Sequence, residues 1–358
     1  MSKSISVIIP TYNERDNVVP LVKRIGGALS DHDYEIVFID DNSGDGTAKL
    51  AAGLSPEYPV RVIVRRDKKG LASAVVDGIG YTSGQLVVVM DADLQHPPEV
   101  IPDLIREAEG DVDVVIASRY VAGGGCQSWG LTRRIISKGA IFLAHMLLPA
   151  TRRIKDPMSG FFMFNRQVVA DARLMPTGYK ILLEILIEGK FQGVAEVPYI
   201  FSSRSGGESK LNARQQTDYL RHVYSLMKRK GELLRFLKFC LVGASGVLVN
   251  MGLLWLLTEF AGFPYLVSAA VSIEFSIISN FVLNNYFTFG DRRLAGARIF
   301  LERLLKFNVV SLFGLGINLG VLYLFTDVFG LYYLLSNLCG IAVAMLWNYL
   351  VNTLWTWR

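Results

Sequence analysis

The stretch VVVMDADLQHPPE, residues 87–99, runs four apolar residues directly into two aspartates and a glutamine at alternate positions. The apolar run is typical of a strand inside a sheet. Asp91, Asp93 and Gln95 follow it, and an extended segment of this kind can direct three oxygen ligands toward a hard cation. Oxygen-only ligands favour Mg²⁺ or Mn²⁺. The alternative is that the aspartates cap a helix that begins near Pro97.

Similar apolar runs occur on both sides of this stretch, with polar, helix-like segments between most of them. They predict strands at about residues 5–10, 34–39, 60–65, 85–90 and 112–118. Such alternation predicts an α/β domain with a mostly parallel, doubly wound sheet, which binds ligands at the carboxyl ends of its strands. These five ends are polar, and they read PTYNE, DDNSGDGT, RDKKG, DADLQ and SRY. The polar segments are therefore expected to meet at one edge.

Charge is unevenly distributed over the 358 residues, whose mean hydropathy is +0.33. Only 13 of the 69 charged residues lie in 235–358. We expect an α/β domain over 1–234 and a membrane domain over 235–358. Basic residues before and within the second half suit an anionic lipid surface better than nucleic acid. Cys126, Cys240 and Cys339 show no paired spacing, which favours a reducing setting without disulfides.

The first half resembles a family-two glycosyltransferase of the GT-A (Rossmann-like) fold, and within that family the polyprenyl-phosphate sugar synthases of the dolichol-phosphate mannose synthase type. The matching motifs are IIPTYNERDN, FIDDNSGDGT, VMDADLQHPPE, SRY, DPMSGFF, GYKILLEIL and SSRSGGESK. The resemblance implies that the nucleotide pocket is lined by Pro10, Tyr12, Glu14 and Asp41, and that the metal is held by Asp91, Asp93 and Gln95.

The residues expected near the nucleotide each allow a functional and a purely structural interpretation. Glu14 is also an acid of the kind favoured at a helix N-terminus. Asp40 and Asp41 are both turn formers, although their adjacency indicates that at least one points into the cleft. Lys69 either approaches the diphosphate or lies solvated on the surface.

The acceptor side is predicted from charge. A lipid monophosphate already carries about −1.5 to −2 at neutral pH and needs cations to hold it, not a base. The expected cradle contains Arg119, Arg133, Ser137, Arg204 and Lys210. The alternative is a set of scattered surface residues. The apolar residues of 131–149 predict either a membrane-surface helix or a core helix, and Asp156 is expected to orient an arginine or a hydroxyl, or to cap a turn.

The second half contains an internal repeat at an offset of 68 residues, in which RFLKF at 235 matches RLLKF at 303. Each copy holds two apolar stretches of bilayer length, which predicts spans near 237–258, 264–287, 305–326 and 332–354 in two parallel repeats. The distribution of Arg and Lys predicts cytoplasmic termini and a cytoplasmic catalytic domain. This half resembles the GtrA-like four-helix domains. Glu274, whose repeat partner is Ala342, marks a polar path or binds helices together.

These features predict a multi-pass membrane enzyme that uses Mg²⁺ or Mn²⁺ and inverts the anomeric carbon. Asp91, Asp93 and Arg119 are its expected catalytic residues. It would transfer one sugar, mannose from GDP-mannose in the first reading, to a polyprenyl phosphate such as dolichyl or undecaprenyl phosphate. UDP-glucose as donor, a processive polysaccharide synthase and a lipid-sugar transporter are the alternatives. An oligomer through the membrane domain is left open.

Overall fold

The computed structural model describes residues 3–67, 70–108, 110–127, 129–202 and 213–358. Contacts between residues divide the chain into two compact units, Met1–Met227 and Lys228–Arg358. The division falls near the predicted boundary after residue 234.

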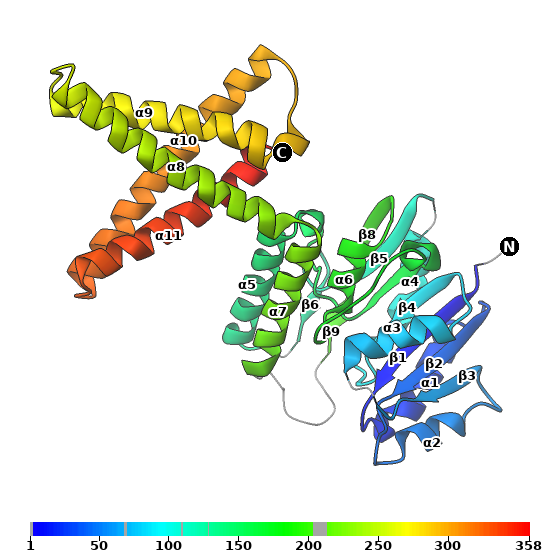
Figure 1. Cartoon of the computed structure of the whole chain (residues 1–358). Coiled ribbons are helices and arrows are strands. Elements are labelled where there is room, and N and C mark those ends of the chain that lie inside the picture. Colours follow the sequence, from blue (N-terminus) through cyan, green and yellow to red (C-terminus); the bar gives the residue numbers. More distant parts are fainter. Residues whose placement is uncertain (1–2, 68–69, 109, 128, 203–212) are drawn as a thin grey trace. The chain divides into compact units, whose positions relative to one another are not determined.

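The first unit is built on a seven-stranded sheet with the order β3-β2-β1-β4-β7-β5-β8 (Figure 1). Its strands are β1 (Ile5–Thr11), β2 (Tyr34–Asp40), β3 (Val60–Val64), β4 (Leu86–Val89), β5 (Val112–Ser118), β7 (Phe162–Asn165) and β8 (Gly193–Pro198). Neighbouring strands pair in parallel, except that β7 runs antiparallel between β4 and β5. Strands β1 to β5 consequently all end at the same edge.

Helices cover both faces of this sheet. The described helices of the unit are α1 (Arg15–Ala28), α2 (Thr47–Ala52), α3 (Leu71–Tyr81), α4 (Ile101–Glu107), α5 (Leu131–Leu147), α6 (Ile181–Glu188) and α7 (Ala213–Arg229). Short 3-10 turns lie at Pro98–Val100, Pro149–Thr151 and Arg166–Val169. A two-stranded ladder joins β6 (Gly125–Cys126) to β9 (Ile200–Phe201).

The central strands β1 and β4 are almost entirely buried because helices cover both faces of the sheet. In β1, Ile5, Val7 and Ile9 belong to one core cluster with α1, whereas Ile8 belongs to the cluster on the opposite face with α3. All five predicted strands are present. The antiparallel β7 was not predicted, because a four-residue apolar run does not reveal the direction of its strand.

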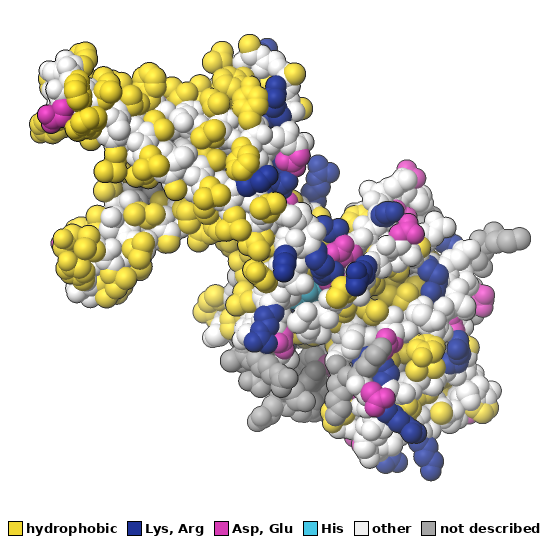
Figure 2. Space-filling view, in the orientation of Figure 1, with side chains coloured by type: hydrophobic (Ala, Val, Ile, Leu, Met, Phe, Trp, Pro, Cys, Tyr) yellow, Lys and Arg dark blue, Asp and Glu magenta, His cyan; other side chains and the backbone are white. Residues whose placement is uncertain are grey.

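The second unit contains four helices that are long and apolar enough to cross a membrane, Glu232–Glu259, Tyr265–Thr288, Ala297–Val328 and Tyr333–Thr356. They correspond to α8 (Glu232–Glu259), α9 (Tyr265–Leu283), α10 (Ala297–Tyr323) and α11 (Tyr333–Val351), of which the last three continue into π-helical turns at Asn284–Thr288, Leu324–Val328 and Asn352–Thr356. A 3-10 turn lies at Gly290–Arg292. Hydrophobic side chains dominate the visible surface of these helices (Figure 2). The four predicted spans are confirmed.

The internal repeat is also visible in the packing. Asn280 of α9 lies so close to Gly246 of α8 that a Cβ at Gly246 would approach its Nδ2 to 2.3 Å, and Asn348 of α11 lies against Gly314 of α10 in the same way, at 2.5 Å from Oδ1. The two contacts are one repeat length apart. These asparagines therefore pack the two helices of each hairpin closely together.

Candidate active site

The site is built from the loops that follow β1, β2, β4 and β5. After β2, Asp40 accepts hydrogen bonds from Thr11 Oγ1 (3.1 Å) and from the backbone and hydroxyl of Ser43 (2.8 and 2.6 Å). It is 1% exposed. Asp40 therefore ties the ends of β1 and β2 together.

Asp41 is held by a buried arginine that follows β3. Arg65 donates to Asp41 Oδ1 through Nε (2.8 Å) and Nη2, and to Asp77 through Nη1 (3.1 Å). The second oxygen of Asp41 accepts the Gly70 backbone N–H at 2.7 Å. The Asp41 carboxylate is thus fixed at the strand ends by Arg65, a residue that the sequence did not single out.

Left-handed backbone conformations occur at three non-glycine residues of these loops. Asn13 and Asn42 have φ of 58°, and Leu94 has φ of 60°. Asparagine tolerates this region, but a leucine there stores strain of roughly 1–3 kcal/mol. Leu94 lies between Asp93 and Gln95, so its backbone conformation sets the directions of these two predicted metal ligands.

The predicted metal ligands lie directly after β4. Asp91 is partly exposed, whereas Asp93 and Gln95 are buried. Asp93 Oδ1 accepts the Gln95 backbone N–H (3.1 Å), and Gln95 Nε2 donates to the Ser202 carbonyl (2.9 Å). The 3-10 turn that starts after Pro97 has no side-chain cap. The capping alternative for the aspartates is therefore wrong.

His96 holds the backbone of this motif in place. Its ring is buried and stacks on Phe161 at 5.4 Å, and its Nδ1 accepts the Asp91 backbone N–H at 3.0 Å. Burial lowers the pKa of His96 to about 4. His96 is therefore neutral at physiological pH and positions Asp91 without contributing charge.

The donor set fits a hard divalent cation. Within the described ranges, no group of three His, Cys, Asp or Glu side chains could hold a metal ion by itself. Mg²⁺ is usually bound by one or two carboxylates together with substrate phosphates and water. Two aspartates and a glutamine on one turn suit that mode of binding.

Arg119, after β5, is fixed by a buried ion pair. Its Nη2 and Nε donate to the two oxygens of Asp156 at 2.7 and 2.8 Å, and its backbone N–H also donates to Asp156. Although burial opposes the charge, Asp156 raises the pKa of Arg119. Asp156 therefore orients Arg119, as one of the two interpretations of Asp156 predicted. It also occupies two of the N–H donors of the guanidinium.

Trp129 brings two predicted cradle residues together. The guanidinium carbon of Arg119 lies 5.1 Å from the Trp129 ring centroid and that of Arg133 lies 4.4 Å from it. These distances permit cation–π attraction. Ser137, one helical turn beyond Arg133 on α5, accepts a 2.9 Å hydrogen bond from the Tyr120 hydroxyl through its Oγ. Arg119, Arg133 and Ser137 are therefore neighbours.

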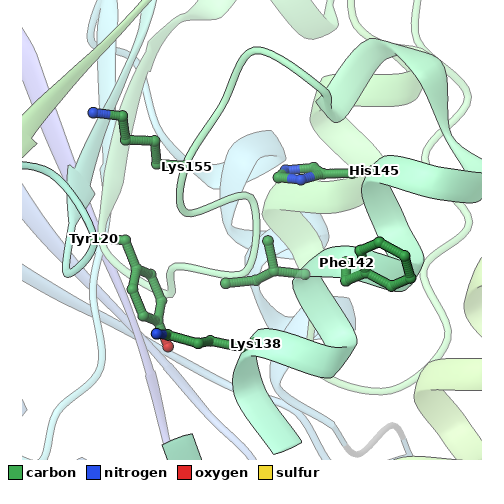
Figure 3. Close-up of a pocket in the computed structure, with 6 residues that line it drawn as sticks. Tyr120, Lys138, Phe142, His145 and Lys155 are labelled. Carbon is green, nitrogen blue, oxygen red and sulfur yellow. The ribbon is translucent and has the colours of Figure 1, made fainter. Parts of the chain in front are cut away.

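A pocket of about 310 Å³ adjoins this group on α5, lined by Tyr120, Lys138, Ile141, Phe142, His145 and Lys155 (Figure 3). Phe142 is 66% exposed, as are other apolar residues along α5. An exposed apolar face contradicts the core-helix reading of 131–149 and agrees with the membrane-surface reading.

Lys180, at the start of α6, is a further cation near the site. Its Nζ donates to the Met158 carbonyl at 2.9 Å. Burial lowers the pKa of Lys180 to about 8, and the charge of Arg119 contributes in the same direction. A partly neutralised lysine beside arginines indicates a region of positive potential.

The structure describes three further residues of the predicted nucleotide pocket. Pro10 is half-buried, Tyr12 is 53% exposed, and Glu14 accepts a hydrogen bond from Asn17 Nδ2 (2.7 Å) without capping α1 through its side chain. Lys69, Arg204 and Lys210 lie outside the described residues.

Sequence reasoning missed Arg65, His96, Trp129 and Lys180. Lys180 had a visible signal, because it interrupts the apolar motif GYKILLEIL. The others had none, since a buried arginine, a stacked histidine and a tryptophan between two cations are recognised only by their partners.

Known proteins match both units. Residues 6–173 match the family described as Glycosyl transferase family 2, and 238–357 match the GtrA/DPMS transmembrane domain. A dolichol-phosphate mannosyltransferase of Pyrococcus furiosus is 48% identical over 353 residues, with 99% of each chain covered. That of Saccharomyces cerevisiae is 38% identical over 239 residues, which cover 63% of this chain and 88% of the yeast protein.

A solved structure shows the same fold. The first unit resembles Mycobacterium tuberculosis glucosyl-3-phosphoglycerate synthase, with 21% identity, a TM-score of 0.50, and coverage of 64% of this chain and 81% of that one. The sheet and its polar edge thus define a glycosyltransferase of the GT-A fold, joined to four membrane-spanning helices. The chain belongs to glycosyltransferase family 2, and within it to the dolichol-phosphate mannosyltransferases with a GtrA/DPMS transmembrane domain.

Proposed function

We propose that this enzyme transfers mannose from GDP-mannose to a polyprenyl phosphate, with inversion at the anomeric carbon and with help from a divalent metal. The names of its relatives support mannose and a dolichol-type acceptor. The observation that carries the proposal is the group of Arg119, Arg133 and Lys180, with Arg119 and Arg133 meeting at Trp129. Such a group is suited to an anionic acceptor.

The donor would be bound at the ends of β1, β2 and β4. Asp41, fixed by Arg65, would contact the nucleotide, as would Pro10, Tyr12, Glu14 and Asp40. Asp91, Asp93 and Gln95 would hold Mg²⁺ or Mn²⁺, which when bound would neutralise charge on the departing diphosphate. Lys69 would approach the diphosphate from its loop.

The acceptor phosphate would be held by Arg119, Arg133 and Ser137, joined by Arg204 and Lys210. One phosphate oxygen attacks the anomeric carbon, the bond from that carbon to the diphosphate breaks, and GDP leaves with the electron pair. No proton needs to be removed, because the phosphate is already ionised. This agrees with a site in which His96 is neutral and engaged with Asp91.

The proposal places the catalytic domain and both termini in the cytoplasm, where nucleotide sugars are made and where the basic juxtamembrane segments would lie. The four spans would anchor the enzyme beside its lipid acceptor.

The test is a panel of nucleotide sugars offered to the purified enzyme with polyprenyl phosphate, with labelled sugar counted in the organic phase. We expect GDP-mannose to be used best and Asp93→Asn to reduce transfer by roughly 100-fold or more, as for loss of one preorganised electrostatic contact. Asp103→Asn, in an exposed pair with Arg106, is the control. Preference for UDP-glucose would contradict the donor assignment, and full activity of Asp93→Asn in EDTA would contradict the metal site.

A further inference from the structure

One exposed polar contact of the membrane unit has no counterpart one repeat length away. Asn308 of α10 donates from Nδ2 to Glu274 Oε1 of α9 at 2.6 Å, and Glu274 is exposed. The residues one repeat length away are Cys240 and Ala342, which are not polar partners of this kind. A carboxylate exposed on a membrane-spanning helix is costly and usually has a function.

A shallow apolar groove lies on the same helix. It has a volume of about 400 Å³ and is lined by Leu312, Phe313, Gly316 and Ile317. A Cβ at Gly316 would meet no atom within 4 Å, so the missing side chain leaves the groove open. The repeat counterpart of Gly316 is Leu248, which is 74% exposed. The groove is therefore a second departure from the repeat.

The polar contact and the groove belong to one surface. Asn308, Leu312 and Gly316 are spaced by four residues, so they lie on the same face of α10. Four residues of helix rise about 6 Å, and the groove thus begins about one turn from Asn308. Three differences between the repeats, at Glu274, Asn308 and Gly316, gather along one strip of the surface of the membrane unit.

A helix clamp does not explain this strip. The asparagines that pack each hairpin, Asn280 and Asn348, occur in both copies and fill notches at glycines. The hydrogen bond from Ser272 to Asn250 in the first hairpin is partly buried. The Glu274–Asn308 contact occurs in one copy and remains exposed. It therefore has room for a ligand.

The chemistry of the strip selects an uncharged amphiphile. Glu274 would repel a phosphate, and Lys306, the nearest cation along α10, is already paired with Glu302 at 2.6 Å. A hydroxyl can donate to the carboxylate and accept from the second N–H of the Asn308 amide. A single groove along one helix suits a single chain.

We propose that the membrane unit binds a long-chain alcohol of the polyprenol class, with its hydroxyl at Glu274 and Asn308 and its chain along the groove of α10. The site is separate from the catalytic site, whose predicted ligand is a phosphate. It gives the membrane unit a means of sensing the uncharged form of a polyprenyl lipid.

The experiment is equilibrium binding of tritiated geranylgeraniol to the full-length protein in nanodiscs. We expect saturable binding that is weakened at least about tenfold in Glu274→Ala, because a hydrogen bond to a charged group is lost. Gly316→Leu, which reproduces the residue of the other repeat, should weaken it similarly by filling the groove. Unlabelled geranylgeranyl phosphate should displace the tritiated alcohol at least about tenfold less effectively than unlabelled geranylgeraniol does, because of repulsion by Glu274.

The control is Gly252→Leu, since a Cβ at that glycine of α8 also meets no atom within 4 Å. It should bind as the wild type does. If Gly316→Leu does not fold, as judged by its elution and thermal unfolding, Asn308→Cys supplies the second test. Unchanged binding in the folded variants, or equal displacement of the tritiated alcohol by alcohol and phosphate, overturns the proposal.

Discussion

Asp156 determines where Arg119 can act, because it takes two donors of the guanidinium and one backbone N–H. Both side chains are nearly inaccessible: that of Arg119 is 7% exposed and that of Asp156 is 0% exposed. Asp156→Asn keeps the shape but leaves a buried arginine without its counter-charge. We expect a loss of about 3–5 kcal/mol in stability, the size found when one partner of a buried pair is removed.

Thermal unfolding of the full chain measures this effect. The control is Asp171→Asn, which breaks the exposed pair with Lys190 and should cost about 0–1 kcal/mol. Equal shifts in the two variants would show that Asp156 does not hold Arg119 in this way.

Lys180 predicts a pH dependence. Burial lowers its pKa from 10.5 to about 8, so its charge is lost as the pH rises through 8. We expect kcat/KM for the lipid phosphate to fall above about pH 8, and Lys180→Arg to extend activity to higher pH because arginine stays charged. Lys190→Arg should leave the profile unchanged.

The contribution of Lys180 to folding stability should rise with pH, whereas the activity falls. Between about pH 8 and 10.5 the unfolded chain binds more protons at Lys180 than the folded chain does, so this group favours folding as the pH rises. If the pH profile of kcat/KM for the lipid phosphate is the same in Lys180→Arg as in the wild type, Lys180 does not act in the acceptor site.

Among the helices, the hairpins of the membrane unit depend on glycine notches. Gly246→Ala would place a Cβ within 2.3 Å of Asn280, which must shift or separate α8 from α9. We expect a loss of about 1–3 kcal/mol, as for overpacking elsewhere. Gly243→Ala, where a Cβ meets no atom within 4 Å, is the control in thermal unfolding. A Gly246→Ala protein as stable as this control would contradict the notch.

Periodicity and strand-end polarity were sufficient to predict β1 to β5, their common edge and the four spans. They were insufficient for β7, whose direction depends on pairing with β4 and β5. The same limit applies to the site. Asp91, Asp93 and Gln95 could be found because they are close in sequence, whereas Trp129 owes its role to Arg119 and Arg133, which only the fold brings together.

For the whole molecule, all proposed catalytic groups precede residue 211, so the chain truncated after about residue 230 should remain a catalyst. We expect it to use a short, detergent-dispersed prenyl phosphate at a comparable rate and a long-chain acceptor in liposomes poorly, because anchoring supplies a high effective concentration. The exposed apolar face of α5 should leave some membrane affinity. A folded truncation that binds nucleotide and metal yet serves neither acceptor would show that the spans complete the site.

A competition between two acceptors tests whether cations, and not a base, activate the acceptor. The full-length enzyme is given labelled GDP-mannose, Mn²⁺ and equal amounts of a polyprenyl phosphate and the polyprenol of the same chain length, and the labelled lipids are separated by anion exchange. We expect label in the anionic lipid alone, because Arg119, Arg133 and Lys180 select a phosphate and neutral, hydrogen-bonded His96 does not deprotonate a hydroxyl. Label in a neutral glycolipid would contradict it.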